Sequence, residues 1–181
     1  GALGQRHAVQ REFLHPLLHR GPGAGQEGGA HPVGPGPQPQ VEAGGLDLIE
    51  LSTVQALPEK FRSRHAESGV SGIAYVRTTA DEARIIGQLL ADKLNAMCGP
   101  VQFLLPVGGL SASDAPGKPC WDPEANEALF CAIEQGFRAS ERKLLKRVPF
   151  HINSKEFASA AAEALGRVCG DMLRLDAHKV G

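Results

Sequence analysis

Residues 79–107 of this 181-residue chain read TADEARIIGQLLADKLNAMCGPVQFLLPV, and this stretch decides the fold class. Its first part predicts a helix over 79–98. Thr79 and Glu82 have the spacing of a capping box, in which each side chain hydrogen-bonds the other residue's backbone amide. Apolar residues then recur at helical spacing. Gly99 follows them, and we expect it to end the helix in the left-handed conformation.

A nearly continuous apolar run, 101–107, comes directly after that helix and is typical of a buried parallel strand. The other predicted elements are strands at 46–51, 72–77 and 143–148, a helix that opens at Asp122-Pro123 and a helix that opens at Asn153. Strands that alternate with helices indicate an α/β fold, so we predict a three-layer subdomain with a mainly parallel sheet. Ligands bind such sheets at the carboxyl ends of the strands. We therefore expect the loops after 107 and 148 to lie side by side and to form the site.

Composition narrows the class of protein. The formal charge is −1, from 19 basic and 20 acidic residues, which removes the simplest electrostatic argument for binding nucleic acid or an anionic membrane surface. No apolar run approaches the ~20 residues that a membrane span needs. The four cysteines have neither the spacing of a zinc site nor that of a dense disulfide framework. We therefore expect reduced thiols, no metal site and a cytoplasmic protein that binds neither nucleic acid nor membrane.

Three segments differ in composition. Residues 1–43 are rich in glycine and proline and poor in branched apolar residues, which predicts a flexible leader. Residues 44–176 carry the α/β pattern, and residues 177–181 form a short tail. The chemistry is therefore expected within 44–176.

The loop that follows the apolar strand is the most unusual stretch. Paired glycines, Gly108 and Gly109, allow a close approach of the backbone, while Ser111 and Asp114 offer a hydroxyl and a carboxylate. One interpretation is a loop that binds an anion or another polar ligand. The other is an ordered connection whose polar side chains satisfy their own backbone. Composition does not decide between these two interpretations. A Walker loop is excluded, because Lys118 is followed by proline rather than by the residue with a hydroxyl group that this motif requires.

His151 and Asn153 occupy the second loop, between the last strand and the last helix. Asn153 is expected to be the N-cap of that helix, since asparagine is favoured there. His151 is open to two interpretations. Its imidazole would move a proton or bind a ligand oxygen, or it would bond carbonyl groups of the loop.

Five stretches resemble the Tm-1-like (UPF0261) family. They are GGLSASDAPG at 108–117, DPEANEALF at 122–130, HIN at 151–153, GLDLI at 45–49 and LPEKFRSR at 57–64. The two longest motifs are specific, and the resemblance extends over roughly 44–168. It departs from the family pattern at Ser113, at Cys120-Trp121 (usually a pair that contains phenylalanine) and at Ser154-Lys155 (usually Asp-Pro).

The resemblance implies a longer protein with two Rossmann-like halves, of which this chain corresponds to the end of the second. The sheet is then incomplete relative to the family. The family is described as ATP-binding, through a segment of the first half that resembles G-T-x-D-T-K-G-E. This sequence lacks that segment, so we do not expect this part of the protein to bind ATP on its own.

Together these observations predict a ligand- or partner-binding α/β module. Its candidate ligand-binding residues are Gly108, Gly109, Ser111, Asp114, His151 and Asn153. The expected partner is a small polar ligand or the N-terminal half of the protein, with self-association left open. Two alternatives remain at this point: an enzyme that hydrolyses or transfers acyl groups through Ser111 or Asp114 with His151 as acid and base, and a purely structural module between subdomains or subunits.

Overall fold

A computed structural model describes residues 43–51, 53–69 and 72–179 of the chain. The predicted leader, 1–43, lies outside the described residues except for its last position. The elements are the strands β1 (Leu48–Leu51), β2 (Ala66–Ser68), β3 (Ala74–Arg77), β4 (Val101–Pro106) and β5 (Lys143–Val148), the 3-10 turns η1 (Val54–Ala56) and η2 (Glu59–Phe61), and the helices α2 (Ala80–Ala96), α3 (Pro123–Gly136) and α4 (Lys155–Lys179). Helix α4 thus continues past position 176, into the predicted tail.

Strands β4 and β5 form a parallel pair, in register from Val101 opposite Lys143 to Pro106 opposite Val148. The last paired residue of β4 is Pro106, which has no amide hydrogen to donate. Helix α3 connects the two strands, as a parallel connection requires. The predicted α/β class is therefore confirmed.

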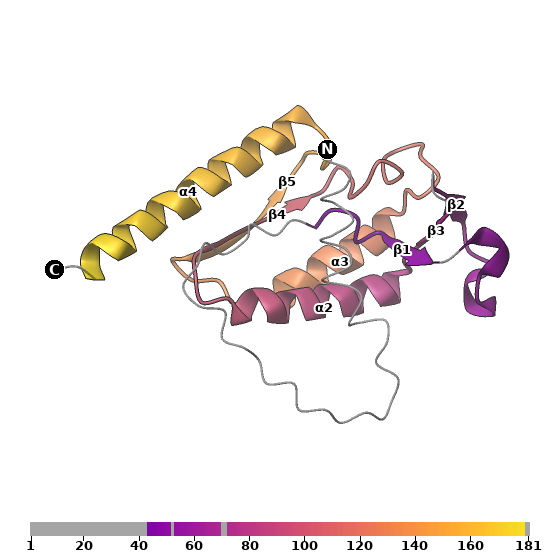
Figure 1. Ribbon diagram of the computed structural model, residues 1–181, viewed down its shortest axis with the longest axis horizontal. Helices are drawn as coiled ribbons and strands as arrows, with labels where there is room; N and C mark the ends of the chain where they lie inside the picture. The colour runs from indigo at the N-terminus through magenta and orange to yellow at the C-terminus, as the bar shows by residue number, and fades with distance from the viewer. Residues whose placement is uncertain (1–42, 52, 70–71, 180–181) are drawn as a thin grey trace, which may run out of the picture. The chain divides into compact units, whose positions relative to one another are not determined.

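Helices α2 and α3 pack side by side against one face of this sheet (Figure 1). Alternate residues of β4, including Phe103 and Leu105, join Leu94 of α2 and Leu129 of α3 in one buried apolar core. The two helices approach closely because glycine stands at the contact: a Cβ atom at Gly87 would lie 2.7 Å from the Cβ of Ala132.

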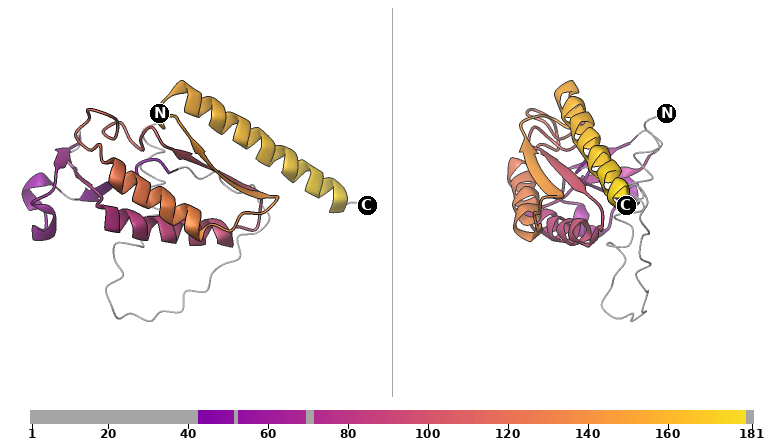
Figure 2. Two further views of the ribbon diagram at one scale, coloured as in Figure 1. Left: turned by 180° about the vertical axis from the view of Figure 1, so that it is seen from behind. Right: turned by 90° about the vertical axis from the view of Figure 1, so that its left-hand side faces the viewer.

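Helix α4 covers the opposite face of the sheet (Figure 2). Leu104 of β4 points to this side, where it packs with Val148, Phe157 and Ala164. The strand is therefore buried on both faces, which explains why its sequence is apolar almost throughout. Sheet and helices form the three predicted layers.

The earlier strands differ from the prediction of a mainly parallel sheet. Strands β1, β3 and β2 form a separate antiparallel sheet in that order. A parallel connection needs a crossover, usually a helix, but β2 and β3 are joined by a short turn closed by a 2.8 Å hydrogen bond from the Gly69 amide to the Ile73 carbonyl. That turn imposes the antiparallel pairing of β2 with β3. The apolar runs predicted β1 and β3 but not their direction, and β2 was not predicted.

The helix ends confirm two predictions and correct two. The capping box of Thr79 and Glu82 is present at the start of α2, and Asp122 caps α3. Helix α2, however, ends at an extended Met97, and Gly99 does not adopt the left-handed conformation. At α4 the cap is Ser154, whose hydroxyl accepts a 3.0 Å hydrogen bond from the Phe157 amide, and not Asn153.

None of the helices in the described part of the chain combines the length and the apolar character that crossing a bilayer requires.

Candidate functional site

The loops that follow β4 and β5 lie side by side, as the parallel arrangement predicts. The Gly108 amide donates a 3.1 Å hydrogen bond to the Phe150 carbonyl, and the Ile152 amide donates one of 3.1 Å to the Gly109 carbonyl. These two bonds lie just beyond the last paired residues of the strands. The carboxyl edge of the sheet thus brings the two sequence motifs together.

The paired glycines make a close approach possible, but the approach is to the chain itself. A Cβ atom at Gly108 would lie 2.5 Å from the His151 amide nitrogen. Gly109 has a φ of +133°, and a Cβ atom there would lie 1.9 Å from the Asp114 carbonyl oxygen. Both positions therefore require glycine for the packing of the two loops, whether or not a ligand binds there.

His151 joins the two loops through both of its ring nitrogens. Nδ1 accepts a 3.0 Å hydrogen bond from the Asn153 amide, so Nε2 carries the proton. Nε2 lies 2.9 Å from the carbonyl oxygen of Ser111 and donates to it. The hydrogen bonds of the imidazole thus go to the backbone and not to the Ser111 hydroxyl, which is the arrangement expected of a residue that positions a loop.

Asp114 is completely buried and holds the first loop in place. Its carboxylate accepts hydrogen bonds from the Leu110 amide at 2.8 Å and from the Asn126 side chain at 2.8 and 3.1 Å. Asn126 lies in the first turn of α3. The interpretation in which the loop's polar groups satisfy their own backbone is therefore correct for this carboxylate.

Arg77, at the end of β3, connects the antiparallel sheet to this loop. The side chain is almost fully buried. Its guanidinium donates to the backbone carbonyls of Asp47, Cys120 and Asp122, to the Thr78 hydroxyl and to the Asn126 side-chain oxygen, over 2.7–3.1 Å. It also lies 4.0 Å from an Asp114 oxygen. Arginine suits this position because its planar fork of donors satisfies several acceptors at once.

Ser111 makes the contact that stands out chemically. Its hydroxyl donates a 2.6 Å hydrogen bond to Oδ2 of Asp47, a residue 64 positions earlier in the chain, just before β1. Asp47 is completely buried, and among the described residues its second oxygen, Oδ1, has no hydrogen-bond partner. Burial raises the pKa of Asp47 to about 6, and the nearby Asp114 adds to the effect. The carboxyl group therefore changes its protonation state near pH 6.

We call Asp47, Arg77, Ser111, Asp114 and Asn126 the polar cluster. Sequence reasoning selected two of its members, Ser111 and Asp114, and missed the other three. Asp47 lies in the GLDLI motif and Asn126 in the DPEANEALF motif, so both motifs contained the missing signal. Nothing in its local sequence distinguished Arg77, because its role depends on contacts 43–49 residues away.

A second group of polar side chains adjoins the polar cluster. Ser113 donates a 2.6 Å hydrogen bond to Glu67 of β2, and the other Glu67 oxygen lies 3.7 Å from His65 Nε2. Cys120 is buried beside them, and burial, together with the nearby carboxylates of Glu67 and Asp47, raises the pKa of its thiol to about 11.

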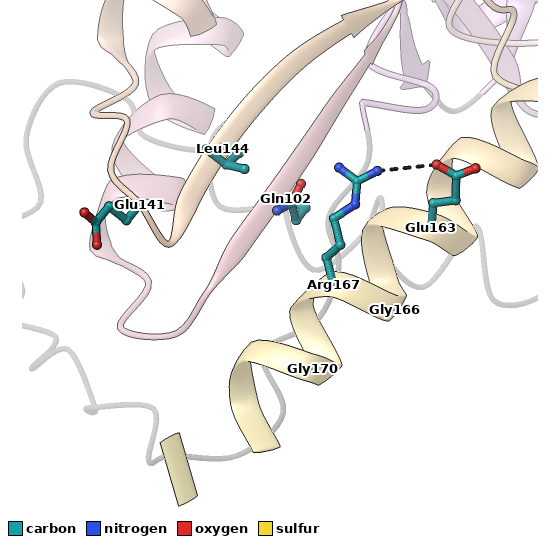
Figure 3. A pocket seen from close by; sticks show the side chains of 7 residues that line it. All are labelled: Gln102, Glu141, Leu144, Glu163, Gly166, Arg167 and Gly170. Atoms are coloured by element: carbon teal, nitrogen blue, oxygen red, sulfur yellow. Dashed lines mark hydrogen bonds and ion pairs between the residues drawn. The ribbon is translucent and has the colours of Figure 1, made fainter. Parts of the chain in front are cut away.

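A shallow pocket lies at the opposite end of the β4–β5 sheet. It has a volume of about 490 Å³ between the sheet and α4. Figure 3 shows Gln102 and Leu144 on the strand side and the Glu163–Arg167 ion pair on the helix side. None of the candidate ligand-binding residues lines this pocket. The carboxyl edge of the sheet therefore remains the candidate site on grounds of side-chain chemistry.

Fold and site together define an α/β subdomain with a buried polar cluster at the carboxyl ends of two parallel strands. Residues 38–169 match the model of the C-terminal domain of the uncharacterised protein family UPF0261. The chain therefore belongs to the UPF0261 family, as the motifs predicted.

Individual relatives agree with the family match. The chain is 37% identical over 121 residues to a UPF0261 protein of Rhizobium meliloti, which covers 67% of this chain and 30% of the relative. It is 38% identical over 122 residues to a UPF0261 protein of Mesorhizobium japonicum, covering 67% and 31%. It is 33% identical over 124 residues to the ToMV resistance protein Tm-1 of Solanum lycopersicum, covering 68% and 16%. The chain thus spans less than a third of the length of these relatives.

Proposed function

We propose that this chain is the binding module of a larger protein, and that its Ser111–Asp47 pair contacts a small polar ligand that donates hydrogen bonds. The observation that carries the proposal is the Asp47 carboxyl group: it is buried, one oxygen accepts the Ser111 hydroxyl at 2.6 Å, and Oδ1 has no partner among the described residues. Buried polar atoms are nearly always paired, so an unpaired one requires an explanation. A ligand hydroxyl or amine would supply the missing donor.

The charges around Ser111 favour such a ligand over an anion. The two loop serines, Ser111 and Ser113, each donate a hydrogen bond to a carboxylate, that of Asp47 and that of Glu67. The nearest buried cation, Arg77, is already engaged by backbone carbonyls and by Asn126. A phosphate or carboxylate placed here would meet like charge, whereas a hydroxyl or an ammonium group would find acceptors.

The remaining candidate residues shape the site in this proposal. Gly108 and Gly109 allow the two loops to touch, Asp114 holds the first loop, and His151 with Asn153 joins it to the second. Ser111 is half-buried, so its hydroxyl is the part of the pair that a ligand meets first. The much greater length of the relatives supports a role for the rest of the protein in covering the ligand.

Thermal unfolding and isothermal titration calorimetry of the 181-residue chain test the proposal. The donor probes are ribose and ethanolamine, and the contrasting probes are acetate, inorganic phosphate and ATP. We expect a donor probe to raise the Tm of the wild type, and Ser111→Ala to weaken its binding by roughly tenfold, the effect of losing one hydrogen bond beside a charged group.

Ser159→Ala is the matched control, because Ser159 is exposed on α4. It is expected to bind the probe like the wild type. The proposal would be overturned if the wild type bound neither donor probe, or if the Ser111→Ala variant bound them with the affinity of the wild type. Tighter binding of acetate or phosphate would overturn the assignment of ligand chemistry.

A further inference from the structure

Three side chains with metal-binding atoms meet beside the polar cluster. His65, Glu67 and Cys120 each offer one ligand atom, and these atoms all lie within 4.8 Å of one another. Cysteine spacing alone predicted no metal site, since the group combines one cysteine with two residues more than 50 positions earlier. We propose that His65, Glu67 and Cys120 bind a divalent zinc-type cation. The inference shares Glu67 with the surroundings of the proposed ligand site, but it does not depend on the Ser111–Asp47 pair that the proposed function assigns to the ligand.

Local structure directs the first two side chains to one place. His65 immediately precedes β2 and Glu67 lies within it. Residues i and i+2 of an extended chain point to the same side, so both side chains face the loop that follows β4. Their contact of 3.7 Å, from Nε2 of His65 to Oε1 of Glu67, is the direct result.

The third ligand is held against them by Ser113. The Ser113 carbonyl accepts a 3.0 Å hydrogen bond from the Cys120 amide, and its hydroxyl donates one of 2.6 Å to Oε2 of Glu67. Arg77 fixes the other side of Cys120 with a 2.8 Å hydrogen bond to its carbonyl oxygen. Ser113 therefore orients one ligand and anchors the backbone of another, and it leaves Oε1 of Glu67 to face the cation. Partners of this kind are typical of protein metal sites.

The distances suit a small cation after a modest contraction. Zinc bound at ~2.0–2.3 Å from tetrahedral ligands holds those ligands roughly 3.3–3.8 Å apart, so a group within 4.8 Å needs to close by about 1 Å. The His65 side chain is about half exposed, so it can supply the movement. Three protein ligands leave a fourth position open, which is the arrangement of a zinc site that also binds water or substrate.

The local charge favours a cation, and the ligand type favours zinc over magnesium or calcium. The surroundings are rich in carboxylates, with Glu67 among the ligands and Asp47 close enough to act on the Cys120 thiol. Sulfur and imidazole ligands select zinc-type ions, whereas magnesium and calcium prefer all-oxygen sites. On binding, the Cys120 thiol releases its proton to solvent and the thiolate sulfur forms the bond to the metal. Cys120 departs from the usual family pattern, so the site is expected in this chain rather than in every relative.

Cobalt(II) provides a direct test, because a thiolate bound to cobalt gives a near-ultraviolet charge-transfer band. The full chain is reduced, stripped of metal and titrated with cobalt(II), and zinc is then added to displace it. We expect a one-to-one titration, loss of the band on adding zinc, and no band with Cys120→Ser. Cys131→Ser is the matched control: Cys131 lies on α3 and contacts Glu127, so this variant is expected to keep the band.

Two further variants test one ligand, His65, and one positioning residue, Ser113. His65→Ala keeps the thiolate and is expected to weaken cobalt(II) binding at least tenfold, while Ser113→Ala acts through Glu67 and is expected to weaken it by roughly 10-fold or more. Circular dichroism confirms that each variant is folded. The proposal is overturned if the folded wild type gives no band with stoichiometric cobalt(II), or if the band survives Cys120→Ser.

Discussion

The apolar core beneath β4 and the polar cluster at the end of that strand are built in different ways. In the core, Phe103, Leu105 and Leu129 are buried among residues that all make the same kind of contact. In the polar cluster, each buried group depends on particular donors and acceptors, such as the Arg77 guanidinium and the Asp114 carboxylate. The core therefore tolerates apolar exchange of similar volume, whereas the loss of one member of the cluster leaves others buried without partners.

The two regions also differ in how completely their buried groups are paired with partners. Packing fills the core, but the cluster retains one unpaired buried oxygen, Oδ1 of Asp47, among the residues that the structure describes. An unpaired buried carboxylate oxygen destabilises the folded state, and departures of this kind from full satisfaction are typical of functional sites. This difference is the reason why we propose that the polar cluster, and not the core, contacts a ligand.

The largest effect is expected in the core. Phe103→Ala removes a side chain that is 1% exposed and should lower the free energy of unfolding by about 3–5 kcal/mol, from lost burial and the cavity left behind. Urea denaturation measures it. Ile85→Ala is the control, since Ile85 is 57% exposed and its truncation should change stability by less than about 0.5 kcal/mol. Similar losses for the two variants would contradict the assignment of the core.

The next effect distinguishes the cluster from the core by its pH dependence. The folded-state pKa of Asp47 is raised from 3.8 to about 6, so its ionisation in the folded protein is unfavourable. This group's contribution to stability is complete below pH 4 and is lost as the pH rises through 6, a change of about 3 kcal/mol. Asp47→Asn should remove that loss, so the variant gains stability over the wild type between pH 4 and pH 8.

Urea denaturation at several pH values gives the difference between the wild type and Asp47→Asn. Asp81→Asn serves as the control, because the Asp81 side chain is 90% exposed. A difference between the wild type and Asp47→Asn that does not change from pH 4 to pH 8 would show that this carboxyl group titrates normally.

The smallest effect concerns a contact that is local in sequence. Thr79→Ala removes the hydroxyl that accepts the Glu82 amide at 3.3 Å, and it should cost about 1 kcal/mol, with little change between pH 6 and pH 8. Thr79→Ser keeps the hydroxyl and should restore most of the stability. Failure of serine to do so would mean that the cap acts through packing of the threonine methyl group instead.

Local signals in the sequence predicted most of the fold. The capping box of α2, the Asp122 cap of α3 and the apolar strand β4 depend on residues within a few positions of one another, and all three are confirmed. The same reasoning failed for the pairing of β1 with β3, because strand direction depends on the connection and not on the strand. It also misplaced the cap of α4, where Ser154 and Asn153 are both good candidates and only the path of the loop selects one.

The sequence predicted where the candidate site lies, but it did not predict all the residues that form it. The parallel strands correctly predicted that the loops at Gly108 and His151 meet. They did not predict that Asp47 receives the Ser111 hydroxyl, since this contact joins residues 64 positions apart. Nor did they predict that both ring nitrogens of His151 would form hydrogen bonds with backbone groups. Side chains with several available partners choose among them only in the folded chain.

The sequence alone determined the α/β class, the helices and the family of this protein. These features depend on neighbouring residues: the period of the apolar residues, the residues that cap helix ends and two specific motifs. Tertiary structure decided which acids, hydroxyls and thiols face one another. It placed Asp47 behind Ser111 and Cys120 beside Glu67. The physical reason is that hydrogen bonding and ionisation respond to distances of a few ångströms, and only the closed chain sets those distances for residues far apart in sequence.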